Sequence, residues 1–460
     1  MGARIRWRRA RRPLLEELAA HIDDQAADYR AQGMGEEEAL ERAVAEMGDP
    51  EAVGRDLDRL HRPDCRWELA LGALLLLLAG VYLQYLVYRE GEAWMMEHYA
   101  RQAENALVAL AALGAAWLSD CTRLLRRRWT APALLLLGCL GALLLGLPSQ
   151  IRMWSVQSYW SLLLPVLYAA CLCRLRDRGG WTALFCGAAA VLLCLPALAV
   201  PNFTAFTVSL LSMLLILGAA VWLGWSRAGR GRGLLLAWGP AGALGALCGA
   251  AGSSHGARWL SAFLHPEADP VGAGFLYLSL REDPGRVLRS PIANGSDYLL
   301  AFLARQWGRW VFAAAALLLL LTAALLLRRI GRLHSRSGKL LALSCLLPLL
   351  LQGAVYLLFN MGWWPGAPLS LPFLSYGETY LVLDAALLGG LLSVFRMDAL
   401  LRDGASGPAG PILPERLELA LAGGGGSASN TAAGGSEAAS EDLYPFFTFS
   451  QELLTSFVIS

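Results

Sequence analysis

The polar side chain best placed for chemistry in this sequence is Asp297, in the stretch "SPIANGSDYLLAFLARQWGRW". It precedes a long apolar run that begins near residue 309, so it lies at or just above the level where a membrane would begin. Carboxylates near hydrocarbon are costly and tend to face a cavity and to have a function. Desolvation also raises the pKa of a carboxyl group, which suits a general base. Asp297 is therefore a candidate base, and the alternatives are a solvated loop acid or a helix N-cap.

Other catalytic signatures are missing from the sequence. It has no nucleotide-binding glycine-rich loop, no His and Cys residues at metal-ligand spacing, and no nucleophile elbow. The run "GGGGS" at 423–427 follows no predicted strand and precedes no helix, so we interpret it as linker. The nine cysteines lie in apolar segments or at their ends, which is typical of small packing residues rather than disulfides or metal ligands.

The elements that position Asp297 are expected to be membrane helices. Apolar residues make up 56% of the 460 residues and charged residues only 17%, whereas soluble proteins keep about a quarter of their residues charged. Apolar runs of about 18 residues or more predict transmembrane helices. We therefore predict an all-α polytopic membrane protein with about ten spans. These cover residues 68–88, 103–120, 130–147, 157–173, 181–199, 204–225, 233–251, 309–327, 340–359 and 374–395.

The arginines predict the orientation of these spans. Short cytoplasmic loops are enriched in Lys and Arg, and the loops after spans 2, 4, 6 and 8 read "TRLLRRRW", "CRLRDRGG", "SRAGRGRG" and "RRIGRLHSRSGK". The short loops on the other side carry one arginine at most. No secretory signal precedes the first span. We expect a multi-pass protein of the bacterial plasma membrane with both termini in the cytoplasm.

Three further segments complete the predicted organisation. Residues 1–65 predict a cytoplasmic bundle of three short helices, and residues 66–400 form the membrane domain. Its outward segment, 252–308, is long for a connecting loop, and long loops are often functional. Residues 401–460 predict a disordered Gly/Ala/Ser-rich linker. The chain ends in a short apolar stretch, which is either a membrane-surface or partner-binding segment or part of a disordered tail.

The N-terminal bundle is expected to bury one face of each helix. In the second helix Leu40, Ala43, Val44 and Met47 share a side, and Asp49 is placed to cap the third helix. The stretch "EELAAHIDD…GMGEEEALERAVAEMGDPEAV" resembles the permease-prefix type of domain found ahead of membrane proteins in Gram-positive bacteria. That resemblance implies a regulatory or docking role.

The stretch "FNMGWWPGAPLSLPFLSYGETYLVLDAALLGGLLSVFR", between and within the last two spans, resembles the signature of the SEDS family. This is the family of the RodA, FtsW and SpoVE proteins of shape, elongation, division and sporulation. The matching residues are Asn360, Gly362, Pro365, Leu371, Pro372, Phe373, Ser375, Tyr376 and Gly377. Two upstream stretches are also similar to family motifs, through Phe263, Pro266, Asp269, Pro270 and Gly274, and through Ser296, Asp297, Tyr298 and Gly308. The resemblance covers about residues 68–398.

The resemblance implies a peptidoglycan glycosyltransferase that polymerises lipid II at the outer face of the membrane. Asp297 would be its general base, acting on the 4-hydroxyl of the acceptor sugar, and undecaprenyl pyrophosphate would leave with inversion. The implied partners are lipid II, membrane lipid and a transpeptidase of the class B penicillin-binding type, and no nucleic acid is expected. The residues expected to contact substrate are Arg152, Arg258, Ser296, Pro372, Ser375, Tyr376 and Gly377.

A diphosphate leaving group requires positive charge. Arg152, Arg258 and Arg305 are the candidates, with surface-exposed arginine as the alternative for each. A divalent cation such as Mg²⁺ is a further candidate, although no metal-binding residues are predicted in the chain.

Several departures from the family pattern leave a second function open. The Glu and Lys that the family has after its Arg-Trp are missing after Arg152, Asn202 stands in place of an acid, and Arg305-Gln306 replaces two acids. Glu378 stands where the family has a second glycine, either as a tolerated residue at the lip or as a substitute for the lost acids. The alternative is a non-catalytic SEDS-like scaffold or lipid-precursor-binding protein in cell-wall or cell-cycle control. A transporter is not favoured, because neither charged residues within the spans nor repeated broken helices are expected.

Overall fold

A computed structural model of the 460-residue chain describes a helical protein. The described residues are 4–5, 8–60, 67–89, 93–126, 129–145, 160–176, 181–199, 203–225, 229–251, 260–272, 274–282, 287–288 and 291–398. They separate into a first unit, which contains the N-terminal residues up to Cys65 together with Met397 and Asp398, and a larger unit that runs from Arg66 to Arg396.

The N-terminal unit contains α1 (Arg8–Ala31), α2 (Glu36–Glu46) and α3 (Pro50–Leu60), as predicted. Asp49 caps α3, because the backbone N–H groups of Glu51 and Ala52 donate to its carboxylate oxygens, both at 3.1 Å.

The predicted buried face of α2 is confirmed at Ala43 and Met47 and wrong at Leu40 and Val44. Ala39, Ala43 and Met47 are buried, whereas Leu40 and Val44 are 47% and 51% exposed. Small alanines allow α1 and α2 to approach closely, so the larger side chains of α2 point away from their partner helix.

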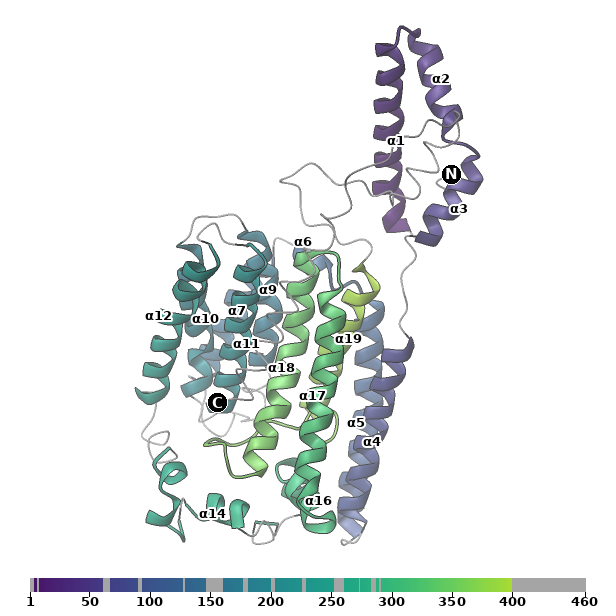
Figure 1. Ribbon diagram of the computed structural model, residues 1–460. Coiled ribbons are helices and arrows are strands. Elements are labelled where there is room, and N and C mark those ends of the chain that lie inside the picture. The colour runs from purple at the N-terminus through teal and green to yellow at the C-terminus, as the bar shows by residue number, and fades with distance from the viewer. Residues whose placement is uncertain are drawn as a thin grey trace, which may run out of the picture. The chain divides into compact units, whose positions relative to one another are not determined.

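The larger unit places a helix at each of the ten predicted spans, and these helices lie side by side (Figure 1). They are α4 (Trp67–Tyr88), α5 (Ala93–Leu118), α7 (Thr130–Leu145), α9 (Leu164–Arg174), α10 (Thr182–Ala199), α11 (Phe203–Trp222), α12 (Arg230–Ala251), α17 (Trp310–Gly331), α18 (Arg336–Asn360) and α19 (Glu378–Arg396).

Among the described residues, five of these helices are long and apolar enough to cross a membrane: α4, α11, α17, α18 and α19. Every regular element described is a helix. The chain is thus an all-helical polytopic membrane protein, while its full number of spans and its orientation stay predictions.

The bundle has central and peripheral helices. Most of α11 and α18 is buried by its neighbours, whereas most of α17 is exposed. The leucines exposed on α17 are Leu317, Leu318, Leu320, Leu321 and Leu325. Apolar side chains exposed along a spanning helix are suited to contact lipid.

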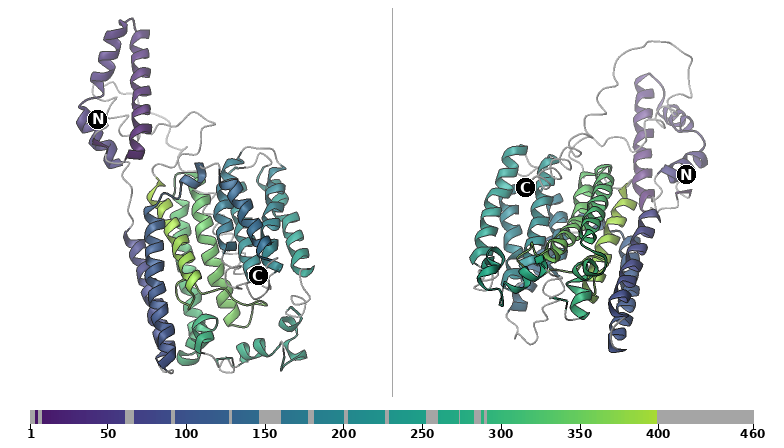
Figure 2. Two further views of the ribbon diagram at one scale, coloured as in Figure 1. Left: turned by 180° about the vertical axis from the view of Figure 1, so that it is seen from behind. Right: turned by 60° about the horizontal axis from the view of Figure 1, so that its bottom comes forward.

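The long segment between α12 and α17 contains short helices. They are η3 (Pro266–Ala268), α14 (Phe275–Glu282), α15 (Pro291–Ser296) and α16 (Leu299–Trp307). Figure 1 shows α14 and α16 at one end of the bundle and α6 (Arg123–Arg126) at the other. The ribbon seen from behind and from below agrees with this arrangement (Figure 2).

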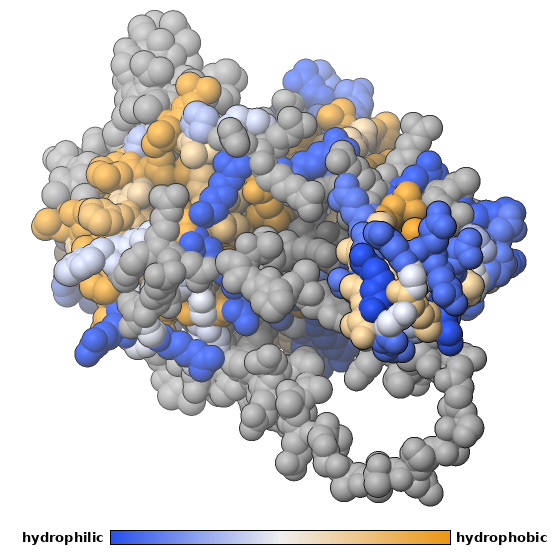
Figure 3. All heavy atoms as spheres, turned by 90° about the horizontal axis from the view of Figure 1, so that it is seen from above, coloured by the Kyte–Doolittle hydropathy of each residue, from blue (hydrophilic) through white to orange (hydrophobic). Residues whose placement is uncertain are grey.

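Arginines gather at the end that contains α6, which we call the arginine end. Their side chains donate to backbone carbonyls where other helices or turns finish: Arg174 to Leu125 (3.4 Å), Arg336 to Leu223 (3.1 Å) and Arg396 to Leu118 (2.7 Å). Cations near helix C-termini offset the negative end of the helix dipole and bond to the last carbonyls. Figure 3 shows the molecule from above, with hydrophilic residues in blue and hydrophobic residues in orange.

Candidate functional site

Residues 361–377 join α18 to α19 without forming a helix, and we call them the signature loop. α18 begins at the arginine end and crosses the bundle, so these residues lie at the opposite end. Irregular backbone among apolar helices requires a hydrogen-bond partner for each buried carbonyl and N–H group. The helices that supply those partners therefore fix the position of the loop.

Three glutamines, one each from α4, α5 and α18, bond to carbonyls of the signature loop. All three side chains are buried, with 0%, 1% and 0% exposure for Gln84, Gln102 and Gln352. Gln84 donates to Leu374 at 2.8 Å, Gln352 to Ser370 at 3.0 Å, and Gln102 to Ser375 at 3.5 Å, the longest of the three. We call these residues the glutamine clamp, which supplies neutral donors to a loop that has lost its helical hydrogen bonds.

A close approach between α4 and the loop fixes the motif "LPF". A Cβ atom at Gly80 would overlap with the backbone carbonyl of Phe373, so only glycine fits at this position of α4. Phe373 has a φ of +66°, a conformation that residues other than glycine rarely adopt, and its side chain is 5% exposed. The backbone at this point is held by its surroundings in a conformation that it would not prefer alone.

The signature loop also holds the residues just before Asp297. The carbonyl of Gly295 accepts the backbone N–H of Tyr376 at 2.8 Å and the side-chain amide of Gln84 at 3.0 Å. Tyr376 and Asp297, about 80 residues apart in the sequence, are therefore brought together through Gly295.

The end of α18 fixes Asp297 from its other side. Asn360 donates to the carbonyl of Asp297 at 3.0 Å and accepts the N–H of Ala301 at 3.1 Å. Tyr356 donates to the carbonyl of Ser296 at 2.8 Å and accepts the N–H of Leu299 at 2.9 Å. The backbone on both sides of Asp297 is thus bonded to two buried side chains of one membrane helix.

Asp297 lies at the boundary between solvent and protein. The residue is exposed to solvent, but it is surrounded by protein on its remaining sides, and this desolvation raises its pKa above the ordinary value of an aspartate. A side-chain hydrogen bond with Ser296 opposes that rise. Burial, followed by the charge of Asp297, raises the pKa of Tyr298 to about 12, and its ring stacks on Phe359 with centroids 5.7 Å apart.

The other residues predicted to contact substrate differ in their exposure. Ser296, Pro372, Tyr376 and Gly377 are half-buried, and Gly377 donates its N–H to Gln102 at 3.4 Å. Ser375 is 3% exposed, and its hydroxyl accepts the N–H of Leu371 at 2.8 Å, so it stabilises the turn of the loop.

The predicted cations are only partly described. Arg152 and Arg258 lie outside the described residues. Arg305 is exposed on α16, two turns after Asp297. Glu378 is the first residue of α19, and its side chain is not described.

Arg281 joins the outer segment to the signature loop. It donates to the carbonyls of Gly362 at 3.0 Å and Phe263 at 3.4 Å. Its guanidinium also contacts the rings of Phe263 and Trp363, at 5.4 and 5.5 Å from their centroids. The structure therefore uses this cation to connect elements, a role that sequence reasoning did not assign.

The described residues have limited capacity for a divalent cation. They contain no group of three or more His, Cys, Asp or Glu side chains that would hold a metal. Mg²⁺ is commonly held by one or two carboxylates together with substrate phosphates. The described residues therefore offer no site made of protein ligands alone for Mg²⁺.

The expectation that the spans carry no charged residue is wrong. Asp384 lies within α19, is fully buried, and accepts a hydrogen bond from Gln352 at 3.4 Å on one carboxyl oxygen. Its other oxygen has no partner among the described residues. Acids buried in a membrane domain are costly and tend to be functional. In the sequence, the single Asp within the apolar run "YLVLDAALLGG" could have indicated this buried acid.

The C-terminal part of the membrane domain matches a known protein family. The family model FTSW_RODA_SPOVE, described as "Cell cycle protein", matches residues 291–399. The matched range begins at α15 and includes Asp297, Asn360, the signature loop and α19. No curated protein matches the chain.

Proposed function

We propose that this chain, whose residues 291–399 match the model of the FtsW/RodA/SpoVE family of cell cycle proteins, polymerises lipid II into peptidoglycan. The observation that carries the proposal is the placement of Asp297. The residue is exposed to solvent, its pKa is raised by the surrounding protein, and its backbone is bonded to Asn360 and, through Gly295, to the signature loop.

The proposed reaction is a displacement at the anomeric carbon of the donor glycan. Asp297 takes the proton from the 4-hydroxyl of the acceptor sugar, and that oxygen forms the new glycosidic bond. The bond to undecaprenyl pyrophosphate breaks, and its electron pair leaves with the diphosphate, so the anomeric configuration inverts. A raised pKa makes the ionised carboxylate of Asp297 a better proton acceptor than that of an ordinary aspartate.

Rigid support for Asp297 favours this role. A general base must remain within hydrogen-bond distance of the proton it removes. Tyr356 and Asn360 are buried and bonded to the backbone around Asp297, so the carboxyl group starts from a fixed position.

The diphosphate would be bound by cationic residues. Arg305, exposed on α16, and Arg258 belong to the outer segment, and Arg152 in the first outer loop is the remaining candidate. A class B penicillin-binding transpeptidase is the proposed partner, since new strands require cross-linking.

A non-catalytic scaffold that binds lipid-linked precursor is the second candidate. The observation that favours it is that much of the described polar surface of the site is used internally. The Ser375 hydroxyl, the Asn360 amide and the Arg281 guanidinium all bond to the protein's own backbone. This leaves Asp297 with few described polar neighbours that a substrate would contact.

Reconstitution in liposomes with lipid II and a class B partner tests the two candidates. Wild-type protein is compared with Asp297→Asn and with Glu282→Gln, which neutralises an exposed acid on α14 in the same outer segment. General bases contribute about 10²–10⁴-fold to rate. We therefore expect Asp297→Asn to lose at least about 100-fold of strand synthesis, and Glu282→Gln to retain it.

Two other outcomes would contradict the proposed reaction. Equal strand synthesis by wild type and Asp297→Asn would remove Asp297 from the reaction. Precursor binding by the wild type without any product, whichever partner is added, would favour the scaffold.

A further inference from the structure

Asp384 is a buried acid that the proposed reaction does not use. Its side chain is 0% exposed, and it belongs to α19, a helix that is apolar enough to span a membrane. An ionised carboxylate that is removed from water needs a cation or several hydrogen-bond donors to be stable. The partners of Asp384 therefore indicate its charge in the folded protein.

No cation compensates for a charge on Asp384. Among the described residues, no charged side chain interacts with it. This holds for the helices packed against α19, which include α4, α5 and α18. The acids, bases and histidine of these three helices are Glu68, Glu97, His98, Arg101, Glu104, Arg336 and Lys339.

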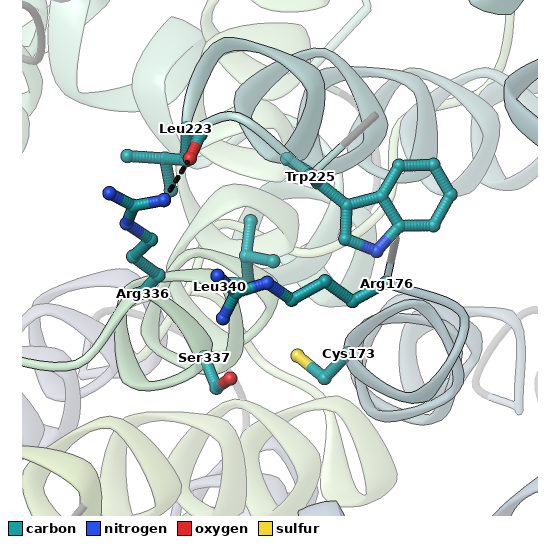
Figure 4. A pocket seen from close by; sticks show the side chains of 8 residues that line it. Cys173, Arg176, Leu223, Trp225, Arg336, Ser337 and Leu340 are labelled. Carbon is teal, nitrogen blue, oxygen red and sulfur yellow. Dashed lines mark hydrogen bonds between the residues drawn. The ribbon is translucent and has the colours of Figure 1, made fainter. Parts of the chain in front are cut away.

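The arginine of α18 lies at the arginine end of the bundle, far from Asp384. Figure 4 shows Arg336 at the start of α18, where its guanidinium donates to the carbonyl of Leu223 at 3.1 Å, beside a small cavity that Arg176 also lines. Gln352, which contacts Asp384, lies roughly 24 Å further along α18, at a rise of 1.5 Å per residue. Arg336 is therefore too distant to form an ion pair with Asp384.

Hydrogen-bond donors for Asp384 are scarce as well. The amide nitrogen of Gln352 lies 3.4 Å from one carboxyl oxygen of Asp384, but it also lies 3.0 Å from the carbonyl oxygen and 2.8 Å from the hydroxyl oxygen of Ser370. An amide NH₂ group has only two protons, so three acceptors share two donors, and the bond to Asp384 is the longest. The other carboxyl oxygen has no partner in the part of the chain that the structure describes.

The amide oxygen of Gln352 is a second buried acceptor in the same place. It belongs to the side chain that Asp384 contacts, and it also lacks a hydrogen-bond partner among the described residues. Buried polar atoms without a hydrogen bond are rare and costly. One proton on Asp384 would remove the charge and would supply an O–H donor for this oxygen.

We propose that Asp384 binds a proton and remains a neutral carboxylic acid in the folded membrane domain. The proton comes from water, and the acid O–H donates to the amide oxygen of Gln352, whose N–H groups donate to Ser370. Asp384 is then a positioning residue, because it fixes the glutamine that holds the signature loop. Neutral hydrogen bonds thus connect α19 to that loop, whatever reaction Asp297 carries out.

Infrared spectroscopy of the purified full-length protein tests the protonation directly. The C=O stretching band of a protonated carboxyl group is separate from the bands of a carboxylate, and it shifts when H₂O is replaced by D₂O. Wild type is compared at neutral pH with Asp384→Asn, which keeps the shape and is neutral. Glu104→Gln, which neutralises an exposed acid on α5, is the matched control. We expect wild type and Glu104→Gln to show the band of the buried acid, and Asp384→Asn to lose it.

Unfolding by SDS in mixed micelles provides a second measurement. Aspartate in water titrates near pH 4, so a neutral Asp384 releases its proton when the protein unfolds at higher pH. Between about pH 5.5 and 7.5, the unfolding constant of wild type should therefore rise by up to about tenfold per pH unit relative to that of Asp384→Asn. Glu104→Gln should keep the slope of wild type. Asp384→Asn should fold, because its amide N–H replaces the acid O–H.

Three results would overturn the proposal. Equal protonated-carboxyl bands in wild type and Asp384→Asn would mean that Asp384 is ionised. Equal pH slopes in these two proteins would mean that unfolding releases no proton from Asp384. Asp384→Thr is a second neutral variant that keeps an O–H donor, and failure of both neutral variants to fold would mean that the membrane domain requires the carboxylate.

Discussion

At both ends of the bundle, side chains from one element donate hydrogen bonds to backbone carbonyls of another, but the donors differ. At the arginine end the donors are charged and partly exposed, as with Arg336 and Arg396. At the signature loop and the residues before Asp297 the fully buried donors are neutral amides and a phenol, as with Gln84, Gln352 and Tyr356. The half-buried Arg281, which donates to Gly362, is the charged exception.

The difference follows from the cost of removing a charge from water. A buried cation without a close anion is strongly destabilising, whereas a buried amide needs only its hydrogen bonds. Charged donors are therefore suited to the solvated helix ends, and neutral donors to the loop enclosed by apolar helices. The comparison also predicts unequal sensitivity, because a carbonyl that loses its donor at the exposed end can bond to water instead.

The largest effect is expected for Asn360→Ala. The change leaves the carbonyl of Asp297 and the N–H of Ala301 without their partners, and each buried unpaired group costs about 1–3 kcal/mol. Thermal unfolding in detergent should show a lowered melting temperature. Met361→Ala, at the adjacent and exposed position, is the control and should change little. Equal stability of the two variants would mean that Asn360 is not needed to hold Asp297.

A somewhat smaller effect is expected for Gly80→Ala. The new methyl group would overlap with the carbonyl of Phe373, and such overpacking typically costs about 1–3 kcal/mol. Hydrogen exchange of residues 361–377 should accelerate as the loop is displaced from α4. Gly72→Ala provides a matched control on the same helix, because a Cβ there meets nothing within 4 Å. If both variants exchange alike, the close approach of loop and helix is not required.

Arg396→Gln tests a charged donor at the arginine end of the bundle. The guanidinium bonds to the carbonyls of Leu118 and Ser119 from an exposed position, so water can replace it. Loss of stability should stay below about 1 kcal/mol, as for other exposed charged contacts. A loss as large as that of Asn360→Ala would contradict the distinction between the two ends.

The smallest change is expected for Ser296→Ala, and it affects the pH dependence of activity. The hydrogen bond with Ser296 favours the ionised carboxylate and so lowers the pKa of Asp297, against the rise caused by burial. Removing the hydroxyl raises that pKa further. Because the base acts in its ionised form, the acidic limb of the rate profile should move to higher pH. A shift to lower pH, or no shift, would mean that the ionisation of Asp297 does not determine the acidic limb of the rate profile.

Much of the fold was predictable, because long apolar runs indicate helices without knowledge of their partners. All ten predicted spans coincide with helices, and the cap at Asp49 follows from local residue types. The register of α2 was not predictable, since its buried face depends on how closely α1 approaches. Leu40 and Val44 are therefore exposed, contrary to expectation.

The candidate site was predictable only in part. Motif resemblance located Asp297 and the signature loop, but not the residues that hold them. Gln84 and Leu374 are 290 positions apart, and neither local spacing nor composition connects them. An isolated Gln or Asp inside an apolar run was the available signal, because polar groups within membrane helices usually have a specific partner.

The glutamine clamp has a consequence for how the protein is made. Gln84 and Gln102 belong to the first two helices of the membrane domain, whereas the loop carbonyls they bond lie just before α19. Along α19, Gly389 lets that helix approach the backbone of α5 at Leu113. During synthesis, these two helices are therefore made well before the loop carbonyls that they bond in the finished fold. Assembly around Asp297 is thus a late event of biogenesis, and a chain truncated before α19 would lack it.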